Sequence, residues 1–153
     1  MLLQILTAGA LVVGRDTLRF DRPATDLRTF YLYGTSVPTY FVTVDYTADF
    51  GTYSGPATFA IEVHGDRLGR MFVLASTGKQ DWRVIDQPGT GRKEFHVVSC
   101  HSDFRQHPGD SVVFVIDYST MRYDGHRWRT RTRTEPGFWE RDDNAWPPPE
   151  KFP

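Results

Sequence analysis

The stretch His126–Thr134 alternates between two kinds of side chain with a strict period of two, and this feature constrains the fold most. Because successive side chains of a β-strand point to opposite faces, the alternation predicts a strand with one basic face. We call this basic side the arginine face; it consists of Arg127, Arg129, Arg131 and Arg133. The opposite face would carry His126, Trp128, Thr130, Thr132 and Thr134.

The rest of the chain also consists of short alternating or apolar segments separated by glycine, proline and aspartate. No window of eleven or more residues keeps a helical period. Residues 111–118 are the strongest predicted strand, with Val112, Phe114 and Ile116 expected to face inward from the middle of a sheet. Residues 58–64 also alternate, with Phe59, Ile61 and Val63 expected to face inward. The pair Asp124-Gly125 predicts a hairpin turn before the arginine strand. Short strands at this spacing predict an all-β fold, namely a single antiparallel β-sandwich or jelly-roll-like domain. A closed β-barrel is the second choice.

With 153 residues, the chain is long enough for one domain with its own core. We assign residues 1–134 to the β domain and residues 135–153 to an extended C-terminal arm. Three consecutive prolines interrupt the arm, which also carries four aromatic residues: Phe138, Trp139, Trp146 and Phe152. We expect these rings to pack onto a neighbouring subunit or back onto the sheet, because an arm free in solvent would leave all four apolar rings exposed to water.

The charge distribution favours a protein partner over nucleic acid. The whole chain has a net charge of -1, so it has no global basic field. Residues 121–134 hold five arginines and one aspartate, whereas residues 135–153 hold five acids and two bases. We therefore expect Arg129 and Arg131 to meet carboxylates of the arm or of another chain. The candidates in the arm are Glu140, Asp142 and Asp143.

The first fourteen residues are apolar but lack the positively charged n-region of a signal peptide, and they are too few to span a bilayer. We therefore predict that they form one or two strands of the fold. The sequence predicts no membrane span. Without a targeting segment, the default expectation is a cytoplasmic or particle-associated protein.

A single cysteine stands among residue types that bind metals. Cys100 is followed by His101, Ser102 and Asp103, with His96 before and His107 after. The spacing matches no zinc pattern, and no third group orients the cysteine and a histidine as nucleophile and base. On a strand, His96 and Cys100 would share a face. We expect a structural thiol, no metal and no cofactor.

Two further patterns suggest catalysis only weakly. The acids Asp45, Asp49, Glu62, Asp81 and Asp86 supply carboxylates for a glycosidase pair, yet scattered acids are normal on the polar faces of strands. The segment Gly89–Lys93 has glycines and bases but lacks the spacing of a phosphate-binding loop, and a hairpin turn explains it better. We predict that the protein is not an enzyme.

The tyrosines give an alternative function. Exposed rings on a sandwich can stack on sugars, although rings in strands more often pack in the core or at its rim. The candidate rings lie in the first third of the chain: Tyr31, Tyr33, Tyr40, Tyr46 and Tyr53.

The sequence thus predicts a non-enzymatic structural or interaction module within an oligomer or larger assembly, such as a virion, tail or surface complex. Its contact residues with other protein subunits would be the arginine face together with Phe138, Trp139 and Trp146. The alternative is a module that binds a carbohydrate or another small ligand.

Overall fold

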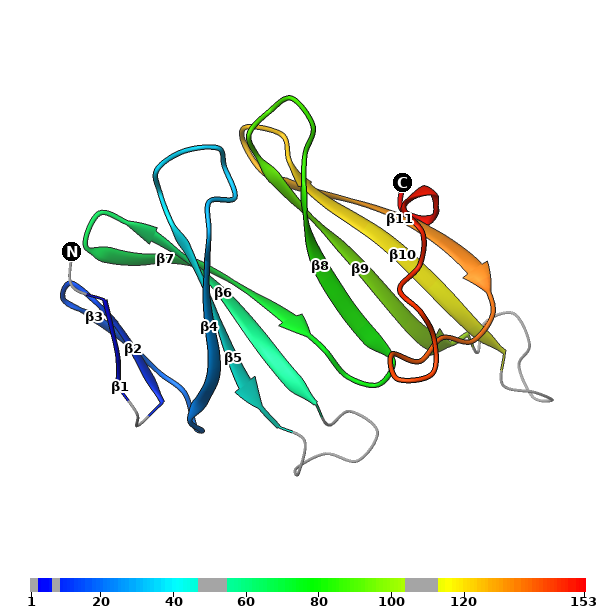
Figure 1. Ribbon diagram of the computed structural model, residues 1–153, viewed down its shortest axis with the longest axis horizontal. Helices are drawn as coiled ribbons and strands as arrows, with labels where there is room; N and C mark the ends of the chain where they lie inside the picture. Colours follow the sequence, from blue (N-terminus) through cyan, green and yellow to red (C-terminus); the bar gives the residue numbers. More distant parts are fainter. Residues whose placement is uncertain (1–2, 7–8, 47–54, 104–112) are drawn as a thin grey trace. The chain divides into compact units, whose positions relative to one another are not determined.

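The computed structural model describes residues 3–6, 9–46, 55–103 and 113–153. These residues form antiparallel β-sheets with one short 3-10 turn and no α-helix, so the prediction of an all-β fold is confirmed. They group into two compact units, Met1–Ala75 and Ser76–Pro153. The boundary that we predicted at residue 134 stays a prediction, and the arm belongs to the second unit (Figure 1).

The first unit contains two antiparallel sheets. The smaller sheet is a meander of three short strands: β1 (Leu3–Leu6), β2 (Ala10–Val13) and β3 (Asp16–Arg19). The larger sheet has four strands in chain order: β4 (Ala24–Phe30), β5 (Thr39–Asp45), β6 (Pro56–His64) and β7 (Arg67–Ala75).

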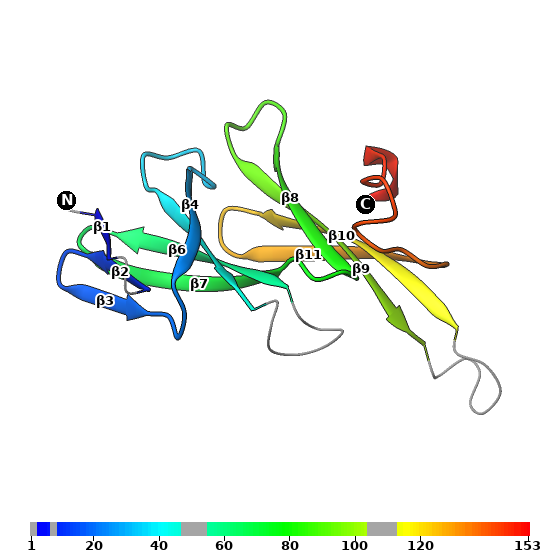
Figure 2. The same cartoon turned by 60° about the horizontal axis from the view of Figure 1, so that its bottom comes forward.

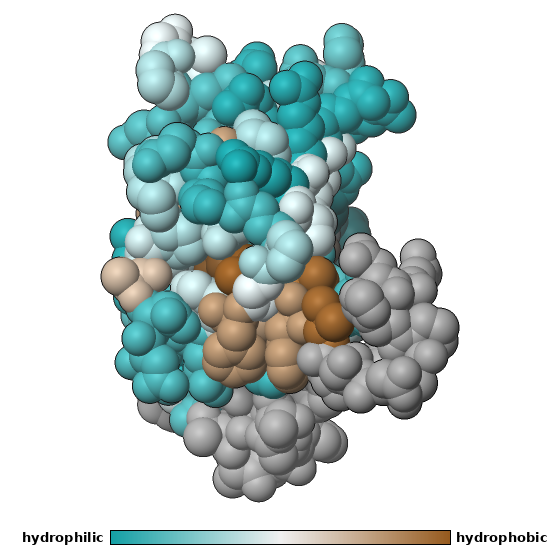
Figure 3. All heavy atoms as spheres, turned by 90° about the vertical axis from the view of Figure 1, so that its right-hand side faces the viewer, coloured by the Kyte–Doolittle hydropathy of each residue, from teal (hydrophilic) through white to brown (hydrophobic). Residues whose placement is uncertain are grey.

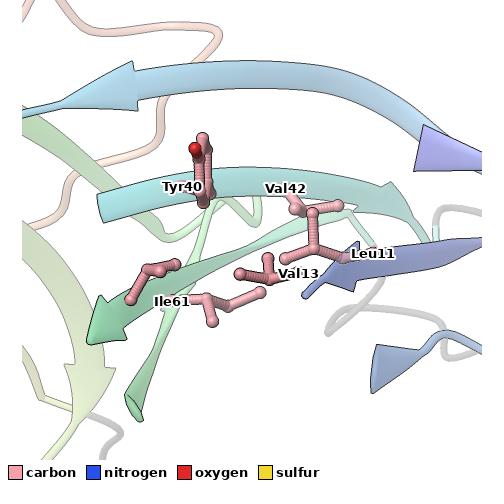
Figure 4. Close-up of a cluster of buried hydrophobic side chains, with 6 residues drawn as sticks. Leu11, Val13, Tyr40, Val42 and Ile61 are labelled. Carbon is pink, nitrogen blue, oxygen red and sulfur yellow. The ribbon is translucent and has the colours of Figure 1, made fainter. Parts of the chain in front are cut away.

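Alternate residues of β2, β5 and β6 form the core between these two sheets. Leu11 and Val13 of the small sheet pack against buried residues of the large one: Tyr40, Val42, Ile61 and Val63 (Figure 4). The inward direction of Ile61 and Val63 agrees with the alternation in the sequence. Two sheets that bury facing residues are a sandwich-like arrangement, as predicted.

A close contact between two turns fixes the small sheet on the large one. Gly14, in the β2–β3 turn, has φ of 57°, and a Cβ atom there would lie 2.4 Å from the Asp66 backbone oxygen. Only glycine fits this left-handed, crowded position. Beside it, the Leu68 backbone N–H donates to Asp16 Oδ2 at 2.9 Å.

The second unit is a four-stranded meander followed by the arm. Its strands are β8 (Gln80–Asp86), β9 (Lys93–Ser102), β10 (Phe114–Tyr123) and β11 (Trp128–Pro136), in the order β11-β10-β9-β8. The central position of β10 and the burial of Ile116 agree with the sequence; Phe114 is half-buried, and Val112 lies outside the described residues. Among the described strands, neither four-stranded sheet closes into a barrel.

The C-terminal arm runs back along the β8–β11 sheet and ends in the 3-10 turn η2 (Pro149–Lys151), as both views of the ribbon show (Figures 1 and 2). Its first residues complete β11. The Gly137 N–H then donates to the Phe114 oxygen at 3.0 Å, and the Arg141 N–H donates to the Gly78 oxygen at 2.7 Å. The arm is therefore hydrogen-bonded to β10 and to the segment that precedes β8.

We predict that Ile61→Ala lowers the free energy of unfolding by about 2–5 kcal/mol, because it leaves a cavity between the two sheets. The matched control is Met71→Ala, since Met71 is the cross-strand partner of Ile61 but is 46% exposed, against 1% for Ile61. Urea denaturation followed by far-UV circular dichroism measures both. All four tryptophans lie after residue 81, so tryptophan fluorescence separately reports the second unit. Equal losses in the two variants would contradict the predicted core.

Candidate functional site on the arginine face

The β10–β11 turn determines how the arginine face is presented. Asp124 Oδ1 accepts the backbone N–H groups of His126 and Arg127 at 2.9 and 3.0 Å, and Asp124 N–H donates to the Arg127 oxygen. This aspartate-glycine turn was expected from the sequence. Because the turn uses residues 126 and 127, β11 begins at Trp128, and Arg127 lies before the strand rather than on it.

The strand register aligns the arginines with residues of β10. Arg129, Arg131 and Arg133 pair with Arg122, Thr120 and Tyr118 respectively. Directly opposed residues of antiparallel strands point to the same side. The opposite side of β11 is also as predicted, since Trp128 contacts the Phe95 ring at 5.2 Å and Thr132 bonds Ser119 at 2.8 Å.

The three strand arginines have different electrostatic partners. Arg129 Nε donates to Asp124 Oδ2 at 2.7 Å, and Arg133 lies 2.5 Å from Glu135 Oε1. Among the described residues, no carboxylate lies within ion-pair distance of Arg131. Arg129 thus meets a carboxylate, but that carboxylate belongs to the turn and not to the arm.

The three acids of the arm that were expected to meet the arginine face make no described ion pair with it. Asp142 pairs with Arg141 at 3.2 Å, and no ion pair among the described residues joins the Glu140 or Asp143 carboxylate to an arginine of β11. Among the described carboxylates of the arm, that of Glu135, where the arm begins, pairs with Arg133; it also accepts a hydrogen bond from Lys151. The hydrogen bond from Lys151, together with the charge of Arg133, lowers the pKa of Glu135.

The turn carboxylate is held in its charged form. The hydrogen bond from Arg129, followed by those from the N–H groups of Arg127 and His126, lowers the pKa of Asp124 well below its ordinary value. The Asp124 carboxylate is therefore ionised across the physiological pH range, and it holds Arg129 in place.

A second carboxylate sits beside the arginine face. Glu94 of β9 is buried; its Oε1 lies 2.9 Å from His96 Nε2, and its Oε2 accepts from Arg122 Nε at 2.6 Å. Burial raises the pKa of Glu94, but the hydrogen bonds from Arg122 and His96 outweigh burial and place it below its ordinary value.

These residues surround a small pocket. Its volume is about 160 Å³, and it is lined by Thr120, Arg122, Asp124, Arg129, Arg131 and Pro153. We call it the arginine pocket. Thr120 is 4% exposed, and its Oγ1 has no hydrogen-bond partner among the described residues. A buried hydroxyl without a partner is uncommon in native proteins.

The arm covers the apolar half of the same sheet face. Trp139 is 5% exposed and packs with Val98, Cys100 and Ile116. Further along, Phe152 stacks between His96 and Trp146, with ring centroids 4.4 and 5.6 Å apart. The predicted aromatic packing of the arm is thus made onto its own sheet.

One aromatic ring of the arm remains outside this packing. Phe138 is 49% exposed, although its ring contacts Phe114 edge-on at 5.1 Å.

The side of the molecule shown in Figure 3 is mostly hydrophilic, with one compact hydrophobic patch.

The tyrosine set does not form a shared surface. Tyr40 is buried in the core of the first unit, and Tyr33 donates a hydrogen bond to Glu62. Tyr46 donates to Asp21 at 2.7 Å, and of the four described tyrosines in this set only Tyr31, at 50%, is largely exposed. Tyr53 lies outside the described residues.

The candidate metal and nucleophile residues are also separated. Cys100 and His96 share a buried face, as the alternation predicts, but Cys100 packs against the arm. His101 is exposed and bonds Asp117 at 3.0 Å; chiefly through this hydrogen bond, the pKa of His101 is raised. His107 lies outside the described residues. Within the described part of the chain, no three histidine, cysteine or acidic side chains form a metal-binding group.

The remaining catalytic candidates have ordinary structural contacts. Asp81 accepts from Ser76 and from the Trp82 N–H, and Asp86 pairs with Lys93. Glu62 lies 3.4 Å from His64 Nε2 in addition to its bond from Tyr33. Gly89 and Gly91 lie in the β8–β9 hairpin turn. Asp45 ends β5, and Asp49 lies outside the described residues.

Sequence reasoning missed Thr120 and Arg122, which line the pocket, and also Glu94, which holds Arg122 from outside the lining. A signal for the first two was present, because the aspartate-glycine turn implies that Arg122 lies opposite Arg129 and Thr120 opposite Arg131. Glu94 lies in β9, and the pairing of β9 with β10 brings it next to Arg122. This pairing could not be read from the β10–β11 hairpin.

No protein-family model matches the sequence, and no similar curated protein or solved structure was found. Among the described residues, no helix has the length and hydrophobicity needed to cross a bilayer.

We predict that Trp139→Ala lowers the free energy of unfolding of the second unit by about 3–5 kcal/mol, because the arm loses the large buried ring that packs on the sheet. Phe138→Ala is the matched control and should cost under about 1 kcal/mol, as is usual for exposed positions. Urea titration followed by fluorescence of the remaining tryptophans measures both. A small effect at Trp139 would mean that the arm is not anchored there.

We also predict a pH-dependent effect of Glu94→Gln. The lowered pKa of Glu94 means that its stabilising contribution is present above its unfolded-state pKa and is lost as the pH falls through its folded-state pKa. Wild type should therefore be more stable than the variant near about pH 6, and the difference should shrink towards about pH 3. Chemical denaturation across this range measures it. A difference that is constant with pH would show that the carboxylate charge is not the cause.

Proposed function

We propose that this chain is a non-enzymatic interaction module that binds an acidic protein surface through its arginine face, as a subunit of a larger assembly. The observation that carries the proposal is the position of Arg131. It stands between Arg129 and Arg133, which are held by Asp124 and Glu135, and it has no carboxylate partner among the described residues.

The neighbouring ion pairs support the proposal by preorganising the surface. An isolated surface ion pair contributes only about 0–1 kcal/mol to stability, so the arginines are poorly explained as a stability device. Guanidinium groups whose directions are already fixed lose less conformational entropy when a partner arrives. Arginine is also enriched in protein interfaces, where it makes bidentate bonds to carboxylates.

The position of β11 gives further support and also supplies the competing explanation. It is an edge strand of its sheet, with six consecutive exposed residues from Arg129 to Thr134. Edge strands expose unpaired backbone groups to other chains, and charged side chains protect them against aggregation. Arginines that only protected the edge would have no specific acidic partner, and this is what the experiment must distinguish.

Nucleic acid is the less favoured partner. A single-strand binding face interleaves basic and aromatic side chains, whereas the aromatic residue of this strand, Trp128, lies on the opposite side from the arginines. The net charge of -1 also supplies no long-range attraction for a polyanion.

We predict that the double variant Arg129→Glu, Arg131→Glu remains folded but loses affinity for an acidic peptide, and that its remaining binding becomes insensitive to salt. The probe is a fluorescent octaglutamate peptide, measured by anisotropy at two salt concentrations. The charge-matched control is the double variant Arg28→Glu, Arg67→Glu in the first unit, because both arginines are exposed and pair with nearby aspartates, Asp26 and Asp16 respectively.

A labelled single-stranded oligonucleotide of mixed sequence is tested in parallel. Tight, strongly salt-dependent binding that disappears in the double variant would favour a nucleic-acid face instead. If neither probe binds while the double variant self-associates along its strand edge, the arginines only protect that edge and the proposal is wrong.

A further inference from the structure

We propose that the arginine pocket is the anchor of this interface and that it binds one carboxylate group, such as a glutamate side chain of the partner. The inference rests on the proposed function, because Arg129 and Arg131 belong to both. It goes further by specifying the chemistry of a single bound group and two residues outside β11, Thr120 and Arg122.

The first argument is the buried hydroxyl. Thr120 lines the pocket, is 4% exposed, and has no hydrogen-bond partner for its Oγ1 among the described residues. Its cross-strand partner is Arg131, so the hydroxyl and that guanidinium flank the same space. An acceptor placed in the pocket would satisfy a donor that otherwise remains unpaired.

The second argument is the unused hydrogen-bonding capacity of the arginines. Arg122 and Arg129 each use Nε for a described carboxylate, Glu94 and Asp124 respectively. Their terminal nitrogens make no described hydrogen bond, and Arg131 has no described partner at all. A guanidinium offers donors and no acceptor, so three of them around one pocket select an anion.

The third argument is the charge balance. The side chains of Arg122, Arg129 and Arg131 carry three positive charges, and those of Asp124 in the lining and Glu94 beside it carry two negative charges, so the side-chain charges sum to +1. One carboxylate neutralises this excess, whereas a phosphate dianion would reverse it. Because Arg122 and Arg129 are 48% and 55% exposed, solvent weakens the effect, and the charge balance alone gives a modest preference for a singly charged group.

The size of the pocket agrees with such a group. A volume of about 160 Å³ is several times the space of roughly 30 Å³ that one water molecule occupies in the liquid. It can hold a carboxylate together with the methylene groups that carry it. Pro153 supplies an apolar wall for those methylenes.

The test uses a ligand that carries a single carboxylate, N-acetyl-glutamate N-methylamide, with the matching glutamine derivative as neutral control. Binding to the full chain is followed by NMR shifts of the arginine Nε–H groups. We expect saturable binding of the glutamate derivative and none of the glutamine derivative up to about 50 mM, the range of weak affinities.

Substitutions locate the binding site. Arg131→Gln and Thr120→Val should each raise the Kd about tenfold or more, as expected for loss of a hydrogen bond to a charged group. Thr120→Ser keeps the hydroxyl and should bind as wild type does. Arg92→Gln is the control, because Arg92 lies over the Tyr123 ring away from the pocket and should change the Kd less than about twofold.

Several results would overturn the inference. These are the absence of saturable binding, an equal response to the glutamine derivative, or an unchanged Kd in Thr120→Val. Inorganic phosphate is titrated as a separate probe, and phosphate binding tighter than that of the glutamate derivative would overturn the choice of a carboxylate.

The octaglutamate experiment separates this inference from the proposed function. Octaglutamate binding that depends on Arg129 and Arg131 but not on Thr120 would retain the interface and reject the pocket as its anchor. Specific binding of the glutamate derivative, with no binding of octaglutamate, would retain the pocket and reject the acidic-surface interface.

Discussion

An antiparallel sheet with one apolar face must have that face covered, and the second unit depends on how this requirement is met. Val98, Cys100 and Ile116 form the apolar part of the β8–β11 sheet, and Trp139 of the arm covers them. The cover is a single irregular segment. It ends at Pro153, in the wall of the arginine pocket, so the packing that completes the core also positions one side of the candidate site.

The same sheet face is therefore divided into two chemically distinct halves. Towards the end where Gly137 bonds Phe114, aromatic and aliphatic groups pack under the arm. Towards the β10–β11 turn, the arginines gather around the buried carboxylate of Glu94 and the exposed carboxylate of Asp124. His96 links the halves, because its ring stacks on Phe152 while its Nε2 contacts Glu94. A change in the arm can thus reach the carboxylate that holds Arg122.

Local patterns in the sequence predicted much of this arrangement. Alternation predicted the strands, the inward direction of Ile61 and Val63, and the two faces of β11, since side-chain direction in a strand follows from the period of two. The aspartate-glycine pair predicted the hairpin. The path of the arm was left open, because aromatic side chains on an irregular segment carry no directional signal. The pocket was missed because Glu94, the carboxylate that holds Arg122, comes from a third strand, and because an unpaired hydroxyl such as Thr120 Oγ1 has no signature in a sequence.

The tight β10–β11 turn makes the arginine face sensitive to a change in chain length rather than in composition. One residue inserted between Asp124 and Trp128 would shift the register of β11 by one position and rotate every following side chain to the other face. Trp128 and Thr130 would then lie opposite Arg122 and Thr120, and the arginines would lie on the face of Phe95 and Ser119. Such an insertion would remove the pocket while every arginine stayed in the chain. Chains related to this one should therefore tolerate substitutions in the turn more readily than insertions or deletions.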